Sequence, residues 1–287
     1  MIRAVIVDMD GTLLDYNNQI SGHTIETIKE YQEKGGIFTI NTGRSYTSTM
    51  GIIGKTGILC DSICLSGAAV YDKSGKCIQS DAMKDDEIRL VRELEDKYGL
   101  YINYLTSEGV VSKSTLDNAK EHYLREAKIR SEKADMVYDE KEALKRYQWI
   151  LDMVHYETDV DAMIKNGAAV FKMTVMSMEQ EILLNAKEEI RSYPNLIAAS
   201  TFPTSFEINA ARVDKGAATL EYIKSYGILP EEVMVIGDSE NDIPMFKLPF
   251  GKRIAMGNAE DCIKELCTDV SLSNNEDGVA HAIQTWA

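Results

Sequence analysis

The chain has 287 residues, of which 44% are hydrophobic and 27% are charged, so it is long enough to form two packed domains. Acidic residues outnumber basic ones by 46 to 31, and the net charge of −15 argues against nucleic acid or an anionic membrane surface as a partner. The five cysteines show no metal-binding spacing, and no long uncharged apolar run predicts a membrane span. We therefore expect a cytoplasmic protein with free thiols.

The first predicted strand, Ala4 to Val7, is a short apolar run that ends on Asp8-Met9-Asp10-Gly11-Thr12. An uninterrupted run of this kind is typical of a strand buried on both faces of a parallel sheet. Open α/β sheets bind ligands at the carboxyl ends of such strands, where Asp8 and Asp10 follow. The pair suits an aspartate nucleophile, a carboxylate that transfers protons, and a divalent metal ion between them. An acidic turn without chemistry is the alternative interpretation of this segment taken alone.

Alternating helices and strands follow, as expected for βαβ units. A helix is predicted from Ser21 to the glycines at 35–36, and strands are predicted over 37–40 and 62–65. A hairpin is expected over 70–78, where two short apolar segments flank a turn that contains glycine. This part of the chain therefore predicts a parallel sheet with an appended hairpin.

The sequence pattern changes near residue 83 and changes back near residue 203. Residues 83–202 mix separate predicted helices and strands, and their strands are not followed by carboxylates. Residues 203–287 again contain a helix that starts at Lys215 and a buried strand that ends on Gly237-Asp238. We therefore predict an α/β fold. We expect the two outer segments to form a core around a parallel sheet, and the block between them to form an inserted α+β domain.

Four polar signals are expected to meet at one edge of this sheet, because parallel strands end there together. They are Asp8 with Asp10, Thr42 with Gly43, Lys215 at a helix start, and the segment Asp238 to Asp242. Taken singly, they could be an acidic turn, a plain turn, a solvated lysine and a helix cap. Four aspartates crowded together would repel one another and be pushed towards protonation, and a divalent cation removes that conflict. Oxygen ligands indicate Mg²⁺.

The chain resembles the haloacid dehalogenase-like hydrolase superfamily, and in particular the Cof-type phosphatases with a type IIB cap. The resemblance covers essentially the whole chain, and the order and spacing of its segments are specific. These segments are Asp8 to Leu13, Thr42-Gly43-Arg44, Lys215-Gly216, Gly237 to Asp242, Ala255-Met256-Gly257-Asn258-Ala259 and Glu276-Asp277-Gly278-Val279-Ala280. One departure is Ser66-Gly67-Ala68, where the family usually has Asn-Gly-Ala. It leaves the catalytic residues intact but changes a side chain at a position where substrate could be contacted.

The resemblance implies a Mg²⁺-dependent phosphatase. It also implies a Rossmann-like core over residues 1–82 and 203–287, with a cap inserted over residues 83–202. Asp8 would attack phosphorus to form an aspartyl-phosphate, and Asp10 would protonate the leaving oxygen and then activate the hydrolytic water. Mg²⁺ would be held by Asp8, the Asp10 backbone carbonyl and Asp238, with Asp242 beside it or contacting its waters. The implied phosphate-binding residues are Met9 through its backbone N–H, Thr42, Gly43, Lys215 and Asn241.

The implied partner is a small phosphorylated metabolite, with sugar phosphates expected most often and pyridoxal phosphate and flavin mononucleotide as further candidates. A sugar phosphomutase or other phosphotransferase on the same core is an alternative that product analysis would separate. A non-catalytic module phosphorylated on Asp8 as a signal is a second alternative. Asp10 argues against it, because a lasting aspartyl-phosphate needs no acid or base beside it. The oligomeric state cannot be read from the sequence.

Overall fold

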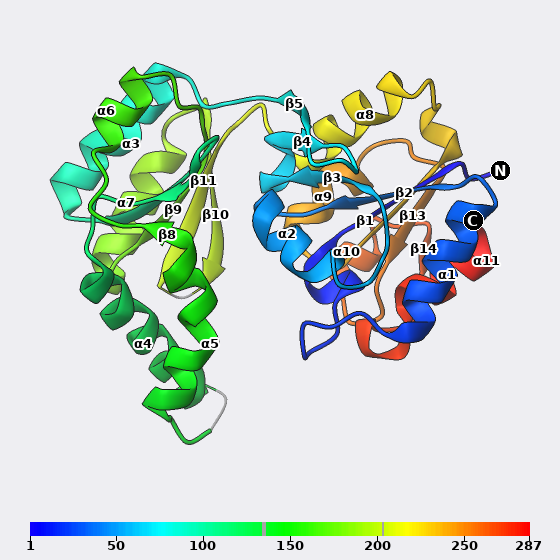
Figure 1. The fold of residues 1–287 in the computed structure, drawn as a ribbon, viewed down its shortest axis with the longest axis horizontal. Coiled ribbons are helices and arrows are strands. Elements are labelled where there is room, and N and C mark those ends of the chain that lie inside the picture. Colours follow the sequence, from blue (N-terminus) through cyan, green and yellow to red (C-terminus); the bar gives the residue numbers. More distant parts are fainter. Residues whose placement is uncertain (134–135, 203) are drawn as a thin grey trace. The chain divides into compact units, whose positions relative to one another are not determined.

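The computed structural model describes residues 1–133, 136–202 and 204–287, and the chain divides into two compact units. The first unit comprises Met1–Asp81 and Arg212–Ala287, and the second comprises Ala82–Ala211. Each unit has its own sheet, as Figure 1 shows. The predicted α/β architecture, a mainly parallel sheet together with a separate second sheet, is confirmed.

The sheet of the first unit is parallel over most of its width. In spatial order it consists of β14 (Asp269–Val270), β13 (Lys252–Ala255), β12 (Val233–Gly237), β1 (Ala4–Val7), β2 (Ile37–Asn41), β3 (Asp61–Cys64), β4 (Ala69–Tyr71) and β5 (Cys77–Ser80). Strands from β14 to β3 run parallel, whereas β4 pairs antiparallel with both β3 and β5. Val7 of β1 lies beside Ile236 of β12 and Ile40 of β2, so these three strands end at the same edge.

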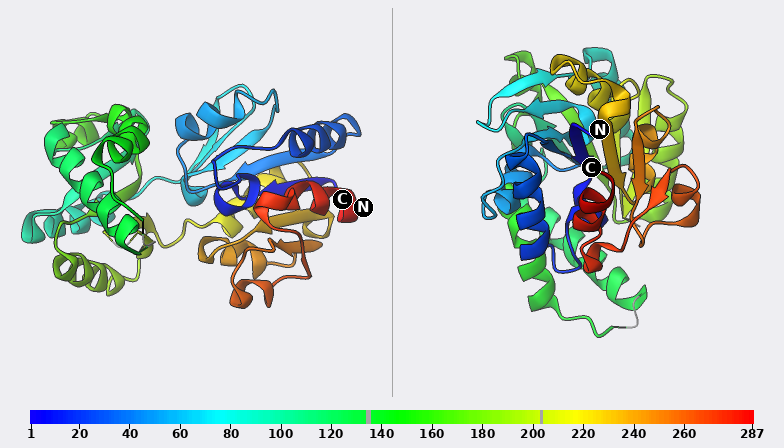
Figure 2. Two further views of the ribbon diagram at one scale, coloured as in Figure 1. Left: turned by 90° about the horizontal axis from the view of Figure 1, so that it is seen from below. Right: turned by 90° about the vertical axis from the view of Figure 1, so that its right-hand side faces the viewer.

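Helices cover both faces of this sheet, because alternate residues of its central strands point to opposite sides. Val5 and Val7 pack against one layer of helices, and Ala4 and Ile6 pack against the other. The first layer contains α1 (Gly22–Glu33), α2 (Tyr46–Ile53) and α11 (Gly278–Trp286), and the second contains α8 (Lys215–Ser225), α9 (Ile243–Phe246) and α10 (Asp261–Lys264). Figure 2 shows this unit from two further directions. Burial on both faces explains why β1 and β12 are uninterrupted apolar runs in the sequence.

The sheet of the second unit is mainly antiparallel. In spatial order it consists of β10 (Leu196–Phe202), β11 (Ser205–Ala210), β9 (Val170–Met176), β6 (Tyr101–Thr106), β7 (Gly109–Val111) and β8 (Val154–His155). Its helices are α3 (Asp85–Tyr98), α4 (Leu116–Lys133), α5 (Glu140–Met153), α6 (Val160–Lys165) and α7 (Gln180–Arg191). Only β7 and β8 pair in parallel among the described strands of this sheet. Among the residues described, no helix has the length and apolar character needed to cross a membrane.

The chain returns to the first unit at Arg212, later than the predicted boundary at residue 203. Residue 203 itself lies outside the described residues. Strand β11, which the sequence pattern assigned to the core, pairs with β9 and β10 in the second sheet, and the first unit resumes at Arg212. The sequence misplaced this strand because a pattern of apolar residues identifies a strand without indicating which sheet it joins.

Candidate active site

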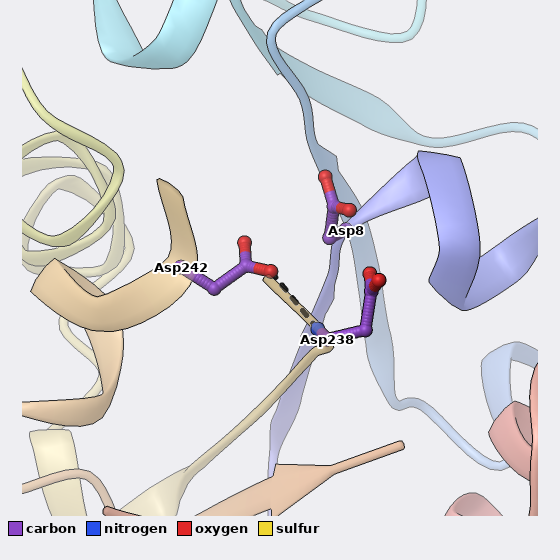
Figure 3. Close-up of side chains that lie close together, drawn as sticks. All are labelled: Asp8, Asp238 and Asp242. Carbon is purple, nitrogen blue, oxygen red and sulfur yellow. Dashed lines mark hydrogen bonds between the residues drawn. The ribbon is translucent and has the colours of Figure 1, made fainter. Parts of the chain in front are cut away.

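Asp8 and Asp238 follow neighbouring parallel strands of the first unit, at the carboxyl ends of β1 and β12. The Asp8 N–H donates to the Ile236 carbonyl (2.9 Å), which continues the pairing of the two strands by one residue. Figure 3 shows these two side chains together with Asp242. One carboxylate oxygen from each of the three residues lies within 4.8 Å of the others. The structure therefore brings Asp8 together with two aspartates from a distant part of the sequence, Asp238 and Asp242.

Asp242 closes the turn that follows β12. Its Oδ2 accepts hydrogen bonds from the N–H groups of Asp238 (3.0 Å) and Ser239 (3.1 Å), the first of which is dashed in Figure 3. A Cβ at Gly237 would lie 2.5 Å from the Asp242 Cγ, so the carboxylate can fold back only against glycine. Asp242 is fully buried, and it therefore supports the turn that carries Asp238 as well as adding negative charge.

Lys215 joins this cluster from the first residue of α8. Its ammonium donates to Asp8 Oδ1 (2.5 Å), Asp242 Oδ1 (2.7 Å) and Asn241 Oδ1 (3.1 Å). The Lys215 side chain is only 1% exposed, so these contacts are shielded from water. Asn241 is exposed, and with its amide oxygen turned to Lys215, its NH₂ group is directed elsewhere.

The cluster carries more negative than positive charge. Burial raises the pKa of Asp8 well above its usual value, against the effect of Lys215, and Asp242 and Asp238 raise it further. Burial also raises the pKa of Asp238 to about 6, although its hydrogen bond from Thr12 acts in the opposite direction. Burial opposes the charge on Lys215, but Asp242 and Asp8 outweigh it and raise the lysine pKa.

One ammonium among three carboxylates leaves an excess of two negative charges in this cluster. A divalent cation would neutralise that excess, and its preferred ligands are carboxylate oxygens of the kind gathered here. The donor set therefore fits a metal ion. Metal binding by Asp8, Asp238 and Asp242 stays a prediction that this donor set allows.

Asp10 is not one of the three clustered aspartates. Its carboxylate forms a bidentate ion pair with Arg44, with Nε to Oδ2 at 2.8 Å and Nη2 to Oδ1 at 2.5 Å. Sequence reasoning expected four crowded carboxylates, whereas the described residues show three together and Asp10 paired separately. The difference arises because the Arg44 guanidinium binds both carboxylate oxygens of Asp10. Metal binding by the Asp10 backbone carbonyl remains a prediction.

Thr42 and Gly43 follow β2 at the same edge of the sheet. Thr42 is fully buried, and its N–H donates to the Ile63 carbonyl of β3 (2.8 Å). Its Oγ1 accepts a hydrogen bond from the Arg44 N–H (3.2 Å), so the turn that presents Gly43 is braced internally. The Met9 side chain is fully buried in the core, and only its backbone could contact a phosphate group.

Ser66 occupies a left-handed backbone conformation directly after β3. The φ angles of Leu65 and Ser66 are +57° and +60°, and the Ser66 N–H donates to the Thr42 carbonyl (3.0 Å). Asparagine adopts this conformation with less strain than most residues, which gives a backbone reason for the family's usual residue. The serine therefore keeps the turn at the expense of some strain.

Several supporting residues were not assigned a role from the sequence. Thr12 Oγ1 donates to Asp238 Oδ1 (2.7 Å), and Ser239 Oγ donates to Asn241 Oδ1 (3.0 Å). Asn41, fully buried at the end of β2, donates from Nδ2 to the Lys215 carbonyl (3.0 Å) and so holds the start of α8. Arg44 was noted only as part of a motif. A polar residue at the end of an apolar strand, as at Asn41, is the local signal that could have indicated such a role.

The profile of the family described as "haloacid dehalogenase-like hydrolase" matches residues 5–283. The chain belongs to this family. This hydrolase is 29% identical over 286 residues to the 5-amino-6-(5-phospho-D-ribitylamino)uracil phosphatase YwtE of Bacillus subtilis, across 98% of this chain and 97% of the relative.

Solved structures of the family have the same fold as this hydrolase. A haloacid dehalogenase-like hydrolase from B. subtilis matches over 100% of both chains with a TM-score of 0.83 and 24% identity. The subclass IIB sugar phosphatase BT4131 matches over 98% of both chains with a TM-score of 0.72 and 21% identity. These structures show the fold, and the family profile over residues 5–283 confirms the membership that the sequence motifs indicated.

Proposed function

We propose that this haloacid dehalogenase-type phosphatase hydrolyses small phosphate monoesters with Mg²⁺ and uses Asp8 as its nucleophile. The observation that carries the proposal is the cluster of Asp8, Asp238 and Asp242, two of which, Asp8 and Asp242, contact the buried Lys215 ammonium. Such a cluster combines a nucleophile, oxygen ligands for a cation, and a positive charge for a phosphate group. Full-length relatives that are phosphatases support the same reading.

The proposed reaction has two displacements at phosphorus. In the first, an Asp8 carboxylate oxygen bonds to phosphorus while the bond from phosphorus to the leaving oxygen breaks, and Asp10 gives a proton to that oxygen. In the second, water attacks phosphorus, Asp10 takes the proton from water, and the bond between phosphorus and Asp8 breaks. Phosphate is released and both aspartates return to their starting states.

The remaining site residues would bind the transferring phosphoryl group. Lys215 supplies a buried positive charge, and the Asn241 NH₂ group, the Thr42 hydroxyl and the backbone N–H groups of Gly43 and Met9 supply hydrogen-bond donors. Bound Mg²⁺ would shield phosphate charge from Asp8, and the residues proposed to hold it are Asp8, Asp10 through its carbonyl, Asp238 and, directly or through water, Asp242.

The second unit, Ala82–Ala211, is proposed to select the substrate, because the nucleophile, the proton carrier and the phosphate contacts all belong to the first unit. A phosphorylated sugar or a ribityl-type phosphate is the substrate class that we propose. This choice is supported by relatives named as a phosphoribitylamino-uracil phosphatase and as a sugar phosphatase.

The test is phosphate release from a panel of monoesters, which includes sugar phosphates, flavin mononucleotide, pyridoxal phosphate and p-nitrophenyl phosphate. We expect turnover with Mg²⁺ and complete loss of turnover when a chelator removes it, with recovery on adding Mg²⁺ back. Free phosphate should exceed any isomerised sugar phosphate. Full activity in the chelator would contradict the metal site, and net isomerisation without phosphate release would indicate a mutase.

The apparent affinity for Mg²⁺ should fall as the pH falls below about 6. The pKa of Asp238 is raised to about 6, so a proton competes with the metal for this carboxylate at a higher pH than it would at an ordinary aspartate. The affinity is therefore retained above that pKa and lost below it, by about tenfold per pH unit if one proton competes. Mg²⁺ activation curves with p-nitrophenyl phosphate, recorded between about pH 5 and 8, check this. An activation constant that stays unchanged from about pH 7 to 5 would contradict it.

A further inference from the structure

The turn that carries Asp10 is held by two asparagines from distant parts of the chain. Asn258, which follows β13, donates from Nδ2 to the Gly11 carbonyl (2.9 Å). Its Oδ1 accepts a hydrogen bond from the Asn274 N–H (2.9 Å). Asn274 in turn donates from Nδ2 to the Leu14 carbonyl (2.8 Å). The Asn258 side chain therefore links the Asn274 backbone to the turn. Together the two asparagine side chains donate to two carbonyl groups of the turn, those of Gly11 and Leu14.

Gly11 is the point at which this turn most needs external support. A Cβ at residue 11 would lie 2.4 Å from Asp238 Oδ2, and the φ of Gly11 is +78°, so both space and backbone conformation require glycine. Glycine is also the residue with the most backbone freedom, and it directly follows Asp10. A hydrogen bond to the Gly11 carbonyl restricts rotation about the backbone bonds of Gly11. Without that restriction, such rotation would displace Asp10.

Two other hydrogen bonds hold this turn, one to Asp238 and one within the turn itself. Thr12 Oγ1 donates to Asp238 Oδ1 (2.7 Å), and the Leu14 N–H donates to the Met9 carbonyl (2.9 Å). These bonds hold residues on both sides of Gly11, but neither one reaches the peptide groups of Asp10 and Gly11. The Gly11 carbonyl is instead bound by the Asn258 side chain, which is its hydrogen-bond donor among the described residues.

We infer that Asn258 is a positioning residue that orients Asp10 for proton transfer, with Asn274 as its support. This inference rests on the proposed function of Asp10. The Asn258 side chain is exposed, so its truncation leaves no cavity in the core, and the effect of its loss should be on geometry more than on folding. A displacement of a proton-transfer group by about 1 Å can lower the rate by up to about a hundredfold.

The test compares two aryl phosphates of similar size, p-nitrophenyl phosphate and phenyl phosphate. The p-nitrophenolate ion leaves without much help from an acid, whereas phenolate is more basic and depends on proton donation. In Asn258→Ala, kcat/KM for phenyl phosphate should fall about tenfold more than kcat/KM for p-nitrophenyl phosphate, because only the first depends strongly on the position of Asp10. A general loss of folded protein would lower both values equally.

Two further variants make the comparison sharper. Asn258→Asp keeps an acceptor for the Asn274 N–H but has no donor for the Gly11 carbonyl, so it should show the same selective loss. Asn275→Ala is the matched control, because Asn275 is an exposed asparagine that accepts a hydrogen bond from the Tyr16 N–H (3.1 Å), outside the part of the turn that holds Asp10. Its ratio of the two kcat/KM values should equal that of the unchanged enzyme.

Equal losses for both substrates in the two Asn258 variants would overturn the inference, as would a selective loss of the same size in Asn275→Ala. Asp10→Asn is measured alongside to separate this result from the proposed function. An Asp10→Asn enzyme that hydrolyses phenyl phosphate at the unchanged rate would contradict the role of Asp10 itself. Loss of that activity in Asp10→Asn, with no selective loss in the Asn258 variants, would reject only the role of Asn258.

Discussion

The Asp8→Asn enzyme should lose catalysis by about four orders of magnitude or more while it keeps its fold. Asp8 is a buried carboxylate of the cluster, in contact with Lys215 and close to Asp238 and Asp242. An amide of the same size removes the negative charge of the nucleophile, and the loss of a group that acts as a nucleophile typically costs several orders of magnitude in kcat. The measurement is kcat for p-nitrophenyl phosphate with saturating Mg²⁺.

Asp61→Asn is the matched control for this change. Asp61 is also a buried aspartate of the parallel sheet, but it begins β3 and so lies at the opposite end of its strand. It accepts hydrogen bonds from Tyr222 (3.0 Å), Tyr226 (2.6 Å) and the Lys73 N–H (2.8 Å). The control should lower thermal stability and leave kcat within about threefold of the unchanged value. If Asp8→Asn kept more than about a tenth of the unchanged kcat, the covalent route would be wrong.

Replacement of Lys215 by methionine should lower kcat/KM by about a hundredfold to a thousandfold, as expected for the loss of one preorganised donor to the transition-state charge. It should also lower the stability of the metal-free protein, because the buried carboxylates of Asp8 and Asp242 would lose the cation that they contact. Breaking a buried ion pair in this way costs about 3–5 kcal/mol. Kinetics and thermal melts in a chelator measure the two effects.

The pH dependence of the Lys215→Met melts has a definite sign. The pKa of Asp8 is raised, so at lower pH this carboxyl takes up a proton and loses the charge that repels Asp238 and Asp242. The loss of stability should therefore be smaller near pH 5 than near pH 8. Lys252→Met is the control, because Lys252 pairs with Asp269 (2.8 Å) at a partly exposed position of the same unit. A Lys215→Met enzyme as active and as stable as Lys252→Met would rule out the proposed role of the ammonium.

Much of the first unit could be predicted because its signals are local. A strand buried on both faces of a parallel sheet must be apolar along its whole length, and it must become polar where it leaves the core. The runs that end on Asp8 and Asp238 therefore identified both the central strands and the edge that carries the site. Local reasoning was weaker at β11, where the same apolar pattern is compatible with either sheet.

The sequence by itself determined that Asp8, Thr42, Lys215 and Asp238 lie at the ends of elements that meet at one sheet edge, because strand direction and burial are encoded in short segments. Only the tertiary structure decided which carboxylates share a space, since Asp10 pairs with Arg44 instead of joining the cluster. It alone also brought Asn258 and Asn274 to the turn after β1. Contacts of this kind depend on side-chain direction and on packing between residues that are distant in the sequence, 34 positions for Asp10 and Arg44 and 247 for Gly11 and Asn258, and no local pattern records them.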